Sequence, residues 1–132
     1  METKVVLDST LLVDFMRKKE HAIAAVNKLS EGYELCTTAI NVFELFYGAN
    51  LGSNIEKNIA ATKGMLNTLT VFNTNQESME TAGRLLAGLE KKGQKIEIRD
   101  VLIAAICLSN SLPIVTANKK HFESTGVNMI EL

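Results

Sequence analysis

Short apolar runs separated by segments of helical periodicity are the feature that most limits the folds open to this chain. The runs are KVVL (4–7), ELCT (34–37), TVFN (70–73) and PIVTAN (113–118), with VNMIEL (127–132) as a candidate fifth. Between them, apolar residues recur three or four positions apart, as they do in amphipathic helices. Strands that alternate with helices predict βαβ units, and therefore an α/β fold with a parallel sheet covered by helices on both faces.

The composition fits a single domain over residues 1–132, because 46% of these 132 residues are hydrophobic and can form a substantial core. The apolar run VLIAAICL (101–108) is far shorter than the roughly 20 residues of a membrane helix. Cys36 and Cys107 lie in apolar segments and form no CxxC motif, so we expect reduced core thiols in a cytoplasmic protein, although one disulfide remains open. The net charge of −1 means that any nucleic-acid binding must use local basic patches.

Three carboxylates stand in apolar surroundings. Asp8 follows the first strand, Glu44 lies within the apolar segment TAINVFELFYGA, and Asp100 opens DVLIAAICL. Each has an ordinary alternative: a helix cap for Asp8, a first-turn acid for Asp100, and a surface or lysine-paired acid for Glu44. All three nevertheless map to the edge where parallel strands end and ligands bind. Acids gathered there would repel one another without a cation, and oxygen-only donors favour Mg²⁺ or Mn²⁺ over zinc.

Four ordered motifs give the chain a resemblance to a known family. VVLDSTLLVDFMR, TTAINVFELFYGA, IEIRDVLIAAICL and IVTANKKHF occur in the order and spacing of PIN-domain proteins. The similarity is greatest to VapC-type toxins of type II toxin–antitoxin pairs. It implies a three-layer α/β/α fold with a central parallel sheet of four to five short strands. It also implies a Mg²⁺- or Mn²⁺-dependent endoribonuclease that acts on RNA, forms a homodimer and is bound by a small cognate antitoxin.

Carried over by position, the resemblance makes Asp8, Glu44 and Asp100 the catalytic, metal-binding acids. We assign Asp8 and Asp100 as the principal ligands, and Glu44 as a ligand or a base that orients water. Ser9, Thr10 and Thr116 are candidates to hold these carboxylates, although capping and strand propensity also explain them.

The chain departs from the family pattern at the fourth acid. Asn118 stands where many relatives have an aspartate, and it can offer a carbonyl oxygen but no charge. Glu97 could supply charge near Asp100, or it could be a solvated loop acid. The number of metal ions, one or two, therefore stays open.

Basic residues near the same loops could bind the phosphates of RNA, which gives affinity without sequence readout. The alternative is an ordinary solvated surface. The candidates are Arg17, Lys18, Lys95, Arg99, Lys119 and Lys120. His121 could act as a base, but with no second histidine nearby we favour a structural or phosphate-contact role.

Two other functions and one assembly prediction complete the sequence analysis. A PIN scaffold could bind RNA or protein without cleaving, although retention of the three acids argues against this. An aspartate phosphoacceptor domain would also use acids at a sheet edge, but it does not match the ordered motifs. The segment TAINVFELFYGANL (38–51) is apolar on nearly every side. We therefore expect part of it to form a two-fold dimer contact together with the neighbouring helix NIEKNIAATKGML (54–66).

Overall fold

A four-stranded parallel sheet lies at the centre of the computed structural model, which describes residues 3–132. Its strands are β1 (Thr3–Leu7), β2 (Tyr33–Thr38), β3 (Thr70–Phe72) and β4 (Ile114–Val115), in the order β3-β2-β1-β4. The register is set where Val5 pairs with Leu35 and Val6 pairs with Ile114. All pairings between these strands are parallel, which confirms the predicted α/β class.

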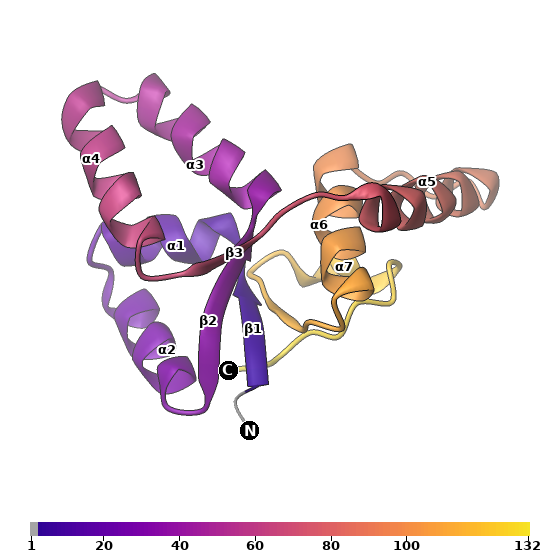
Figure 1. The fold of residues 1–132 in the computed structure, drawn as a ribbon, viewed down its shortest axis with the longest axis horizontal. Helices are drawn as coiled ribbons and strands as arrows, with labels where there is room; N and C mark the ends of the chain where they lie inside the picture. Colours follow the sequence, from indigo (N-terminus) through magenta and orange to yellow (C-terminus); the bar gives the residue numbers. More distant parts are fainter. Residues whose placement is uncertain (1–2) are drawn as a thin grey trace.

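Seven helices lie within residues 3–132, and Figure 1 shows them in two groups around the sheet. On one side lie α1 (Ser9–Met16), α2 (Glu20–Ser30), α3 (Ala39–Leu51) and α4 (Ile55–Leu66); on the other lie α5 (Gln76–Lys91), α6 (Ile98–Ser109) and α7 (Lys119–Glu123). The chain therefore has the expected layers of helices, sheet and helices. Between residues 3 and 132, no helix combines the length and apolarity needed to cross a membrane.

The core divides at β1, whose side chains alternate between the two faces of the sheet. Val5 and Leu7 pack on the side of α1 and α2, whereas Val6 packs with Cys36 and Ile103 on the side of α6. This two-residue alternation is the strand geometry itself, and all three β1 side chains are fully buried. Because both faces are covered there, the last three residues of the strand have to be apolar, up to its end at Asp8.

Side-chain caps fix where several helices begin. Asp8 accepts a hydrogen bond from the Ser9 backbone N–H at the start of α1. Thr38 and Asn41 form a reciprocal capping box at the start of α3. α1 and α3 therefore both begin directly at the ends of neighbouring strands, β1 and β2, which places their first turns at the same edge of the sheet.

One of the expected strands is shorter than predicted, and the candidate fifth strand does not form. In PIVTAN only Ile114 and Val115 form a strand, and VNMIEL forms no fifth strand. That segment contributes one bridge, Ile114 to Met129, because its pairing partner β4 is only two residues long. The Ile114 backbone bonds the chain at Asn128 and Ile130 over 2.9 Å each, so the C-terminal segment still covers the edge of β4.

Candidate functional site

Three elements bring the three predicted acids to one place. Asp8 ends β1, Glu44 lies in the second turn of α3, and Asp100 lies in the first turn of α6. The two aspartates are each 1% exposed, whereas the Glu44 side chain is 24% exposed. Their common neighbour is Arg99: its Nη1 pairs with Asp100, and its Nη2 lies 2.7 Å from Glu44 Oε1 and 3.4 Å from Asp8 Oδ1.

Asp8 is held by neutral donors on both of its oxygens. Oδ1 accepts hydrogen bonds from the Ser9 N–H at 2.8 Å and from Asn41 Nδ2 at 2.9 Å. Oδ2 accepts one from the Thr116 hydroxyl at 2.7 Å. These bonds compensate for the water that a buried carboxylate has lost, and they fix its orientation. Asp8 is thus both the cap of α1 and a positioned member of the acid cluster.

Asn41 is a site residue that the sequence analysis missed. It is fully buried, and its amide group donates to Asp8 and, at 2.9 Å, to the Ser9 hydroxyl. The Ser9 hydroxyl in turn donates to Glu44 Oε1 at 2.7 Å, so Asn41 connects Asp8 to Glu44. A signal was present in the sequence, because Asn41 stands one helical turn before Glu44 in an otherwise apolar segment.

Burial and charge act in opposite directions on Asp100 and Arg99. Burial raises the pKa of Asp100, and the positive charge of Arg99 only partly offsets it. Burial by itself would lower the pKa of Arg99, but the hydrogen bond and charge of Glu44, together with Asp8 and Asp100, raise it instead. The guanidinium is therefore held firmly in its charged form. His121 supports Asp100 from the other side, with its Nδ1 3.1 Å from Asp100 Oδ2.

The remaining predicted site residues lie at different distances from the acids. Ser9 and Thr116 contact them directly, as described above. The Asn118 backbone N–H donates to the Thr116 hydroxyl at 3.0 Å, so it acts on Asp8 through Thr116. Glu97 is exposed beside Asp100. Thr10 instead lines a separate, mostly apolar groove of about 440 Å³ between α1, α2 and the end of β4.

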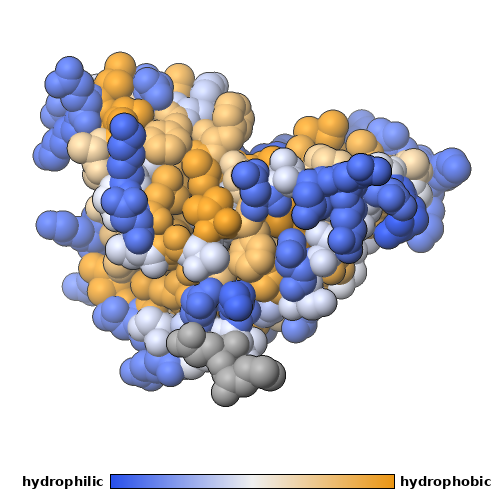
Figure 2. Space-filling view, viewed as in Figure 1, coloured by the Kyte–Doolittle hydropathy of each residue, from blue (hydrophilic) through white to orange (hydrophobic). Residues whose placement is uncertain are grey.

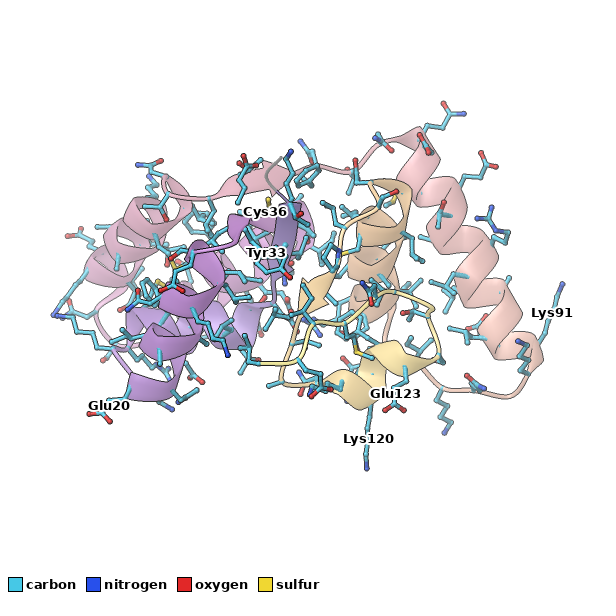
Figure 3. The ribbon with its side chains drawn as sticks, turned by 90° about the horizontal axis from the view of Figure 1, so that it is seen from below. Glu20, Tyr33, Cys36, Lys91, Lys120 and Glu123 are labelled. Atoms are coloured by element: carbon cyan, nitrogen blue, oxygen red, sulfur yellow. The ribbon has the colours of Figure 1, made fainter. Side chains whose placement is uncertain are left out.

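A cleft of about 370 Å³ opens onto Asp100 and carries part of the predicted basic rim. Lys95 and Lys120 line it, with Glu97 and His121. Lys120 projects outward from α7 (Figure 3). Lys119 is paired with Glu131 over 2.7 Å.

The other basic candidates lie away from this rim. Arg17 and Lys18 follow the end of α1 that is opposite to Asp8. Arg99, expected at the rim, lies among the acids instead, and its side chain is 26% exposed. The structure therefore separates the predicted phosphate contacts into three places rather than gathering them in one.

The donor set suits a hard divalent cation, because carboxylates and a neighbouring amide are the oxygen ligands that Mg²⁺ and Mn²⁺ prefer. Asp8, Glu44 and Asp100 are the residues that would hold such an ion. Their present spacing is that of a guanidinium site: within residues 3–132, no three His, Cys, Asp or Glu side chains stand close enough to share one metal ion. The chemistry of the donors fits, and in this structure the three acids are arranged around Arg99.

Comparison with known proteins places this arrangement in context. The family model of the PIN domain matches residues 5–128 of this chain. "tRNA(fMet)-specific endonuclease VapC" of Shigella flexneri is 27% identical over 123 residues, which are 93% of this chain and 92% of that protein. "Ribonuclease VapC2" of Haemophilus influenzae is 30% identical over 120 residues, 91% and 90% of the two chains. The DNA-bound VapBC structure from Salmonella typhimurium superposes with a TM-score of 0.85 at 29% identity, covering 98% of this chain and 97% of that one.

Proposed function

The chain belongs to the PIN domain family, and on that premise we propose that it is an endoribonuclease toxin of a VapBC-type pair. Its substrate is RNA, its ion is Mg²⁺ or Mn²⁺, its partner is a small antitoxin, and it acts in the cytoplasm. The named relatives support the ribonuclease activity over nearly the whole chain. The observation that carries the proposal is the convergence of Asp8, Glu44 and Asp100, from three separate elements, on one point at the edge where the strands end.

The roles of the residues follow from their environments. A bound divalent ion would supply a Lewis acid for the phosphoryl oxygen and an activated water. Thr116 and Asn41 hold Asp8 in a fixed orientation for that ion, and His121 does the same for Asp100. Glu44 is less buried than the two aspartates and is oriented by Ser9, so besides helping to hold the ion it is placed to accept a proton from the attacking water. Lys95 and Lys120 bind phosphates at the cleft.

Cleavage of RNA by the purified protein tests the proposal. We expect cleavage with Mg²⁺ or Mn²⁺ and none with excess EDTA, on a panel that includes tRNA(fMet), the RNA in the name of one relative. Asp100→Asn should lose nearly all activity and remain folded. Asp14→Asn is the matched control, because Asp14 pairs with Lys19 and His21 outside the cluster and should retain activity.

Two outcomes would contradict this function. Cleavage that survives EDTA would exclude the metal-dependent mechanism. RNA or protein binding without cleavage under any divalent ion would instead favour the alternative of a catalytically weak PIN scaffold.

A further inference from the structure

Arg99 occupies the centre of the acid cluster. It directly precedes Asp100 in the first turn of α6, and its guanidinium pairs with all three acids. Its Nε is buried and faces Glu44 as an ion pair, without the geometry of a hydrogen bond. One side chain of the chain's own sequence therefore pairs with carboxylates that come from positions 8, 44 and 100.

Without a metal ion, the guanidinium reduces the electrostatic repulsion between the buried carboxylates. Asp8 and Asp100 are both almost fully buried, and like charges in a shared site oppose each other's ionisation. A planar fork with five donors can satisfy several carboxylate oxygens at once. It does so by standing between the acids, which keeps them apart.

A divalent ion needs a different arrangement of the same oxygens. Mg²⁺ draws its ligands to about 2.0–2.1 Å, whereas the oxygens now surround a group several atoms wide. Around Arg99, within residues 3–132, no three acids lie close enough together to share one metal ion. The guanidinium and the ion use the same oxygens of Asp8, Glu44 and Asp100, so both cannot hold the cluster together.

We propose that Arg99 is the resident counter-cation of the metal-free site, and that metal binding is an exchange in which its guanidinium withdraws. The inference rests on the proposed function only for the identity of the ion. Its consequence is quantitative. The metal binds the fraction of molecules in which Arg99 has left, so the apparent affinity is lower than the intrinsic affinity of the acids. Arg99 thus sets the metal concentration at which the protein becomes active.

Chemical labelling can follow the withdrawal directly. The sequence has three arginines, and Arg17 and Arg84 are both exposed, so they serve as internal references for modification by phenylglyoxal. In metal-free protein we expect Arg99 to be labelled more slowly than the two references. Saturation with Mn²⁺ should accelerate labelling of Arg99 and leave Arg17 and Arg84 unchanged. Labelling of Arg99 that stays constant or slows as Mn²⁺ saturates would overturn the exchange.

Metal affinity gives a second measurement that does not depend on RNA. Mn²⁺ binding, followed by electron paramagnetic resonance at matched ionic strength, should tighten by about tenfold or more in Arg99→Gln. Arg84→Gln is the matched control, because it makes the same substitution at an exposed arginine of α5, outside the acid cluster. Its Mn²⁺ affinity should stay close to that of the wild type. Equal affinities in Arg99→Gln and wild type, or equal gains in the two variants, would refute the proposal.

A guanidinium supplied from solution separates occupation of the site from a general effect of charge. In metal-free Arg99→Ala, methylguanidinium should raise the unfolding temperature and weaken Mn²⁺ binding in proportion to its concentration. Tetramethylammonium at the same concentration should do neither, and wild-type protein should respond to neither ion. Arg99→Ala that folds only with methylguanidinium present would also support the proposal. Failure of methylguanidinium to compete with Mn²⁺ would overturn it.

The two proposals fail in different ways. If the wild-type protein cuts no RNA with any ion, the proposed function is wrong, while the labelling and affinity results still decide the exchange. If RNA is cut but the metal affinity is independent of Arg99, the function stands and the exchange is wrong.

Discussion

At the scale of single residues, the site depends on neutral side chains as much as on its acids. Asn41 bonds Asp8 and Ser9 from a fully buried position, and it also completes the capping box of α3. Thr116 bonds the other oxygen of Asp8. These contacts together fix the orientation of the buried carboxylate.

Asn41→Ala should therefore reduce both stability and activity. It removes two hydrogen bonds in the site and half of a capping box, so we expect the free energy of unfolding to fall by about 2 kcal/mol. Denaturant unfolding measures this loss, and Asn27→Ala on the exposed face of α2 is the control, expected to change little. An Asn41→Ala protein with wild-type stability and RNA cleavage would show that Asp8 does not need this partner.

The two buried thiols give a prediction about pH. Burial raises the pKa of Cys36 to about 11 and that of Cys107 to about 12, from an ordinary value of 9.0. Above pH 9 the thiols ionise in the unfolded chain but stay protonated in the folded protein. Stability that is fully present below pH 9 is therefore lost as the pH rises towards 11, at about 1.4 kcal/mol per pH unit for each thiol.

Unfolding free energies measured between pH 8 and about pH 11 test this prediction. Other groups also titrate in this range, so the contribution of the thiols has to be isolated with a variant that lacks them. The double variant Cys36→Ala, Cys107→Ala should lose less stability per pH unit than the wild type. Identical pH slopes in the two proteins would show that these thiols ionise as readily in the folded state as in the unfolded chain.

At the scale of elements, α3 presents an apolar face that the chain itself does not cover. Phe43, Tyr47 and Leu51 are 68%, 60% and 69% exposed, and they follow one another at four-residue spacing along the helix. The Phe43 and Tyr47 rings stack with centroids 6.2 Å apart. Hydrophobic residues gather over α3 and α4 at the upper left of Figure 2. The opposite face of α3 contributes Asn41, Leu45 and Ala49 to the interior.

We expect this face to be the contact of a homodimer. The double variant Phe43→Glu, Tyr47→Glu places two charges in the contact and should be monomeric, while it keeps the helix content of the wild type. Leu108→Glu, which alters a 36% exposed leucine on α6, should remain dimeric. Light scattering coupled to size exclusion measures both, and a wild-type monomer at micromolar concentration would refute the prediction.

The order and type of these elements could be predicted from the sequence, because each has a strong local signal. Helical spacing and β-branched runs locate the layers. The end of a strand places Asp8 at the edge of the sheet, and the start of a helix places Asp100 there. The length of β4 could not be predicted, because it depends on its neighbour β1, whose last residue, Leu7, pairs with Val115. The position of Arg99 could not be predicted either. Its contacts reach residues 55 and 91 positions away, and the relative placement of α1, α3 and α6 decides them.

At the scale of the whole molecule, the resemblance to PIN-domain proteins extends beyond the site to the complete chain, as the family match over residues 5–128 confirms. The proposed toxin activity therefore makes a prediction in cells. Induced production of the wild-type chain alone should arrest growth, and co-production of its cognate antitoxin should restore it.

Matched variants separate RNA cleavage from a general burden of expression. Asp100→Asn should be harmless at equal protein levels, because it removes a buried acid of the cluster, whereas Asp14→Asn should arrest growth as the wild type does. Viable counts after induction measure the effect. Growth arrest by Asp100→Asn would show that the toxicity does not arise at this site.

The two edge strands of the sheet limit the ways in which other proteins can bind this one. A sheet accepts a foreign strand at an open edge that is long enough to offer a row of unpaired backbone groups. Here one outer strand, β3, has three residues, and the opposite one, β4, has two and is covered by the backbone at Asn128 and Ile130. Strand addition and the edge-to-edge aggregation that follows from it are thus both disfavoured. A binding partner has to meet the molecule through its helices and clefts, by side-chain recognition rather than by extension of the sheet.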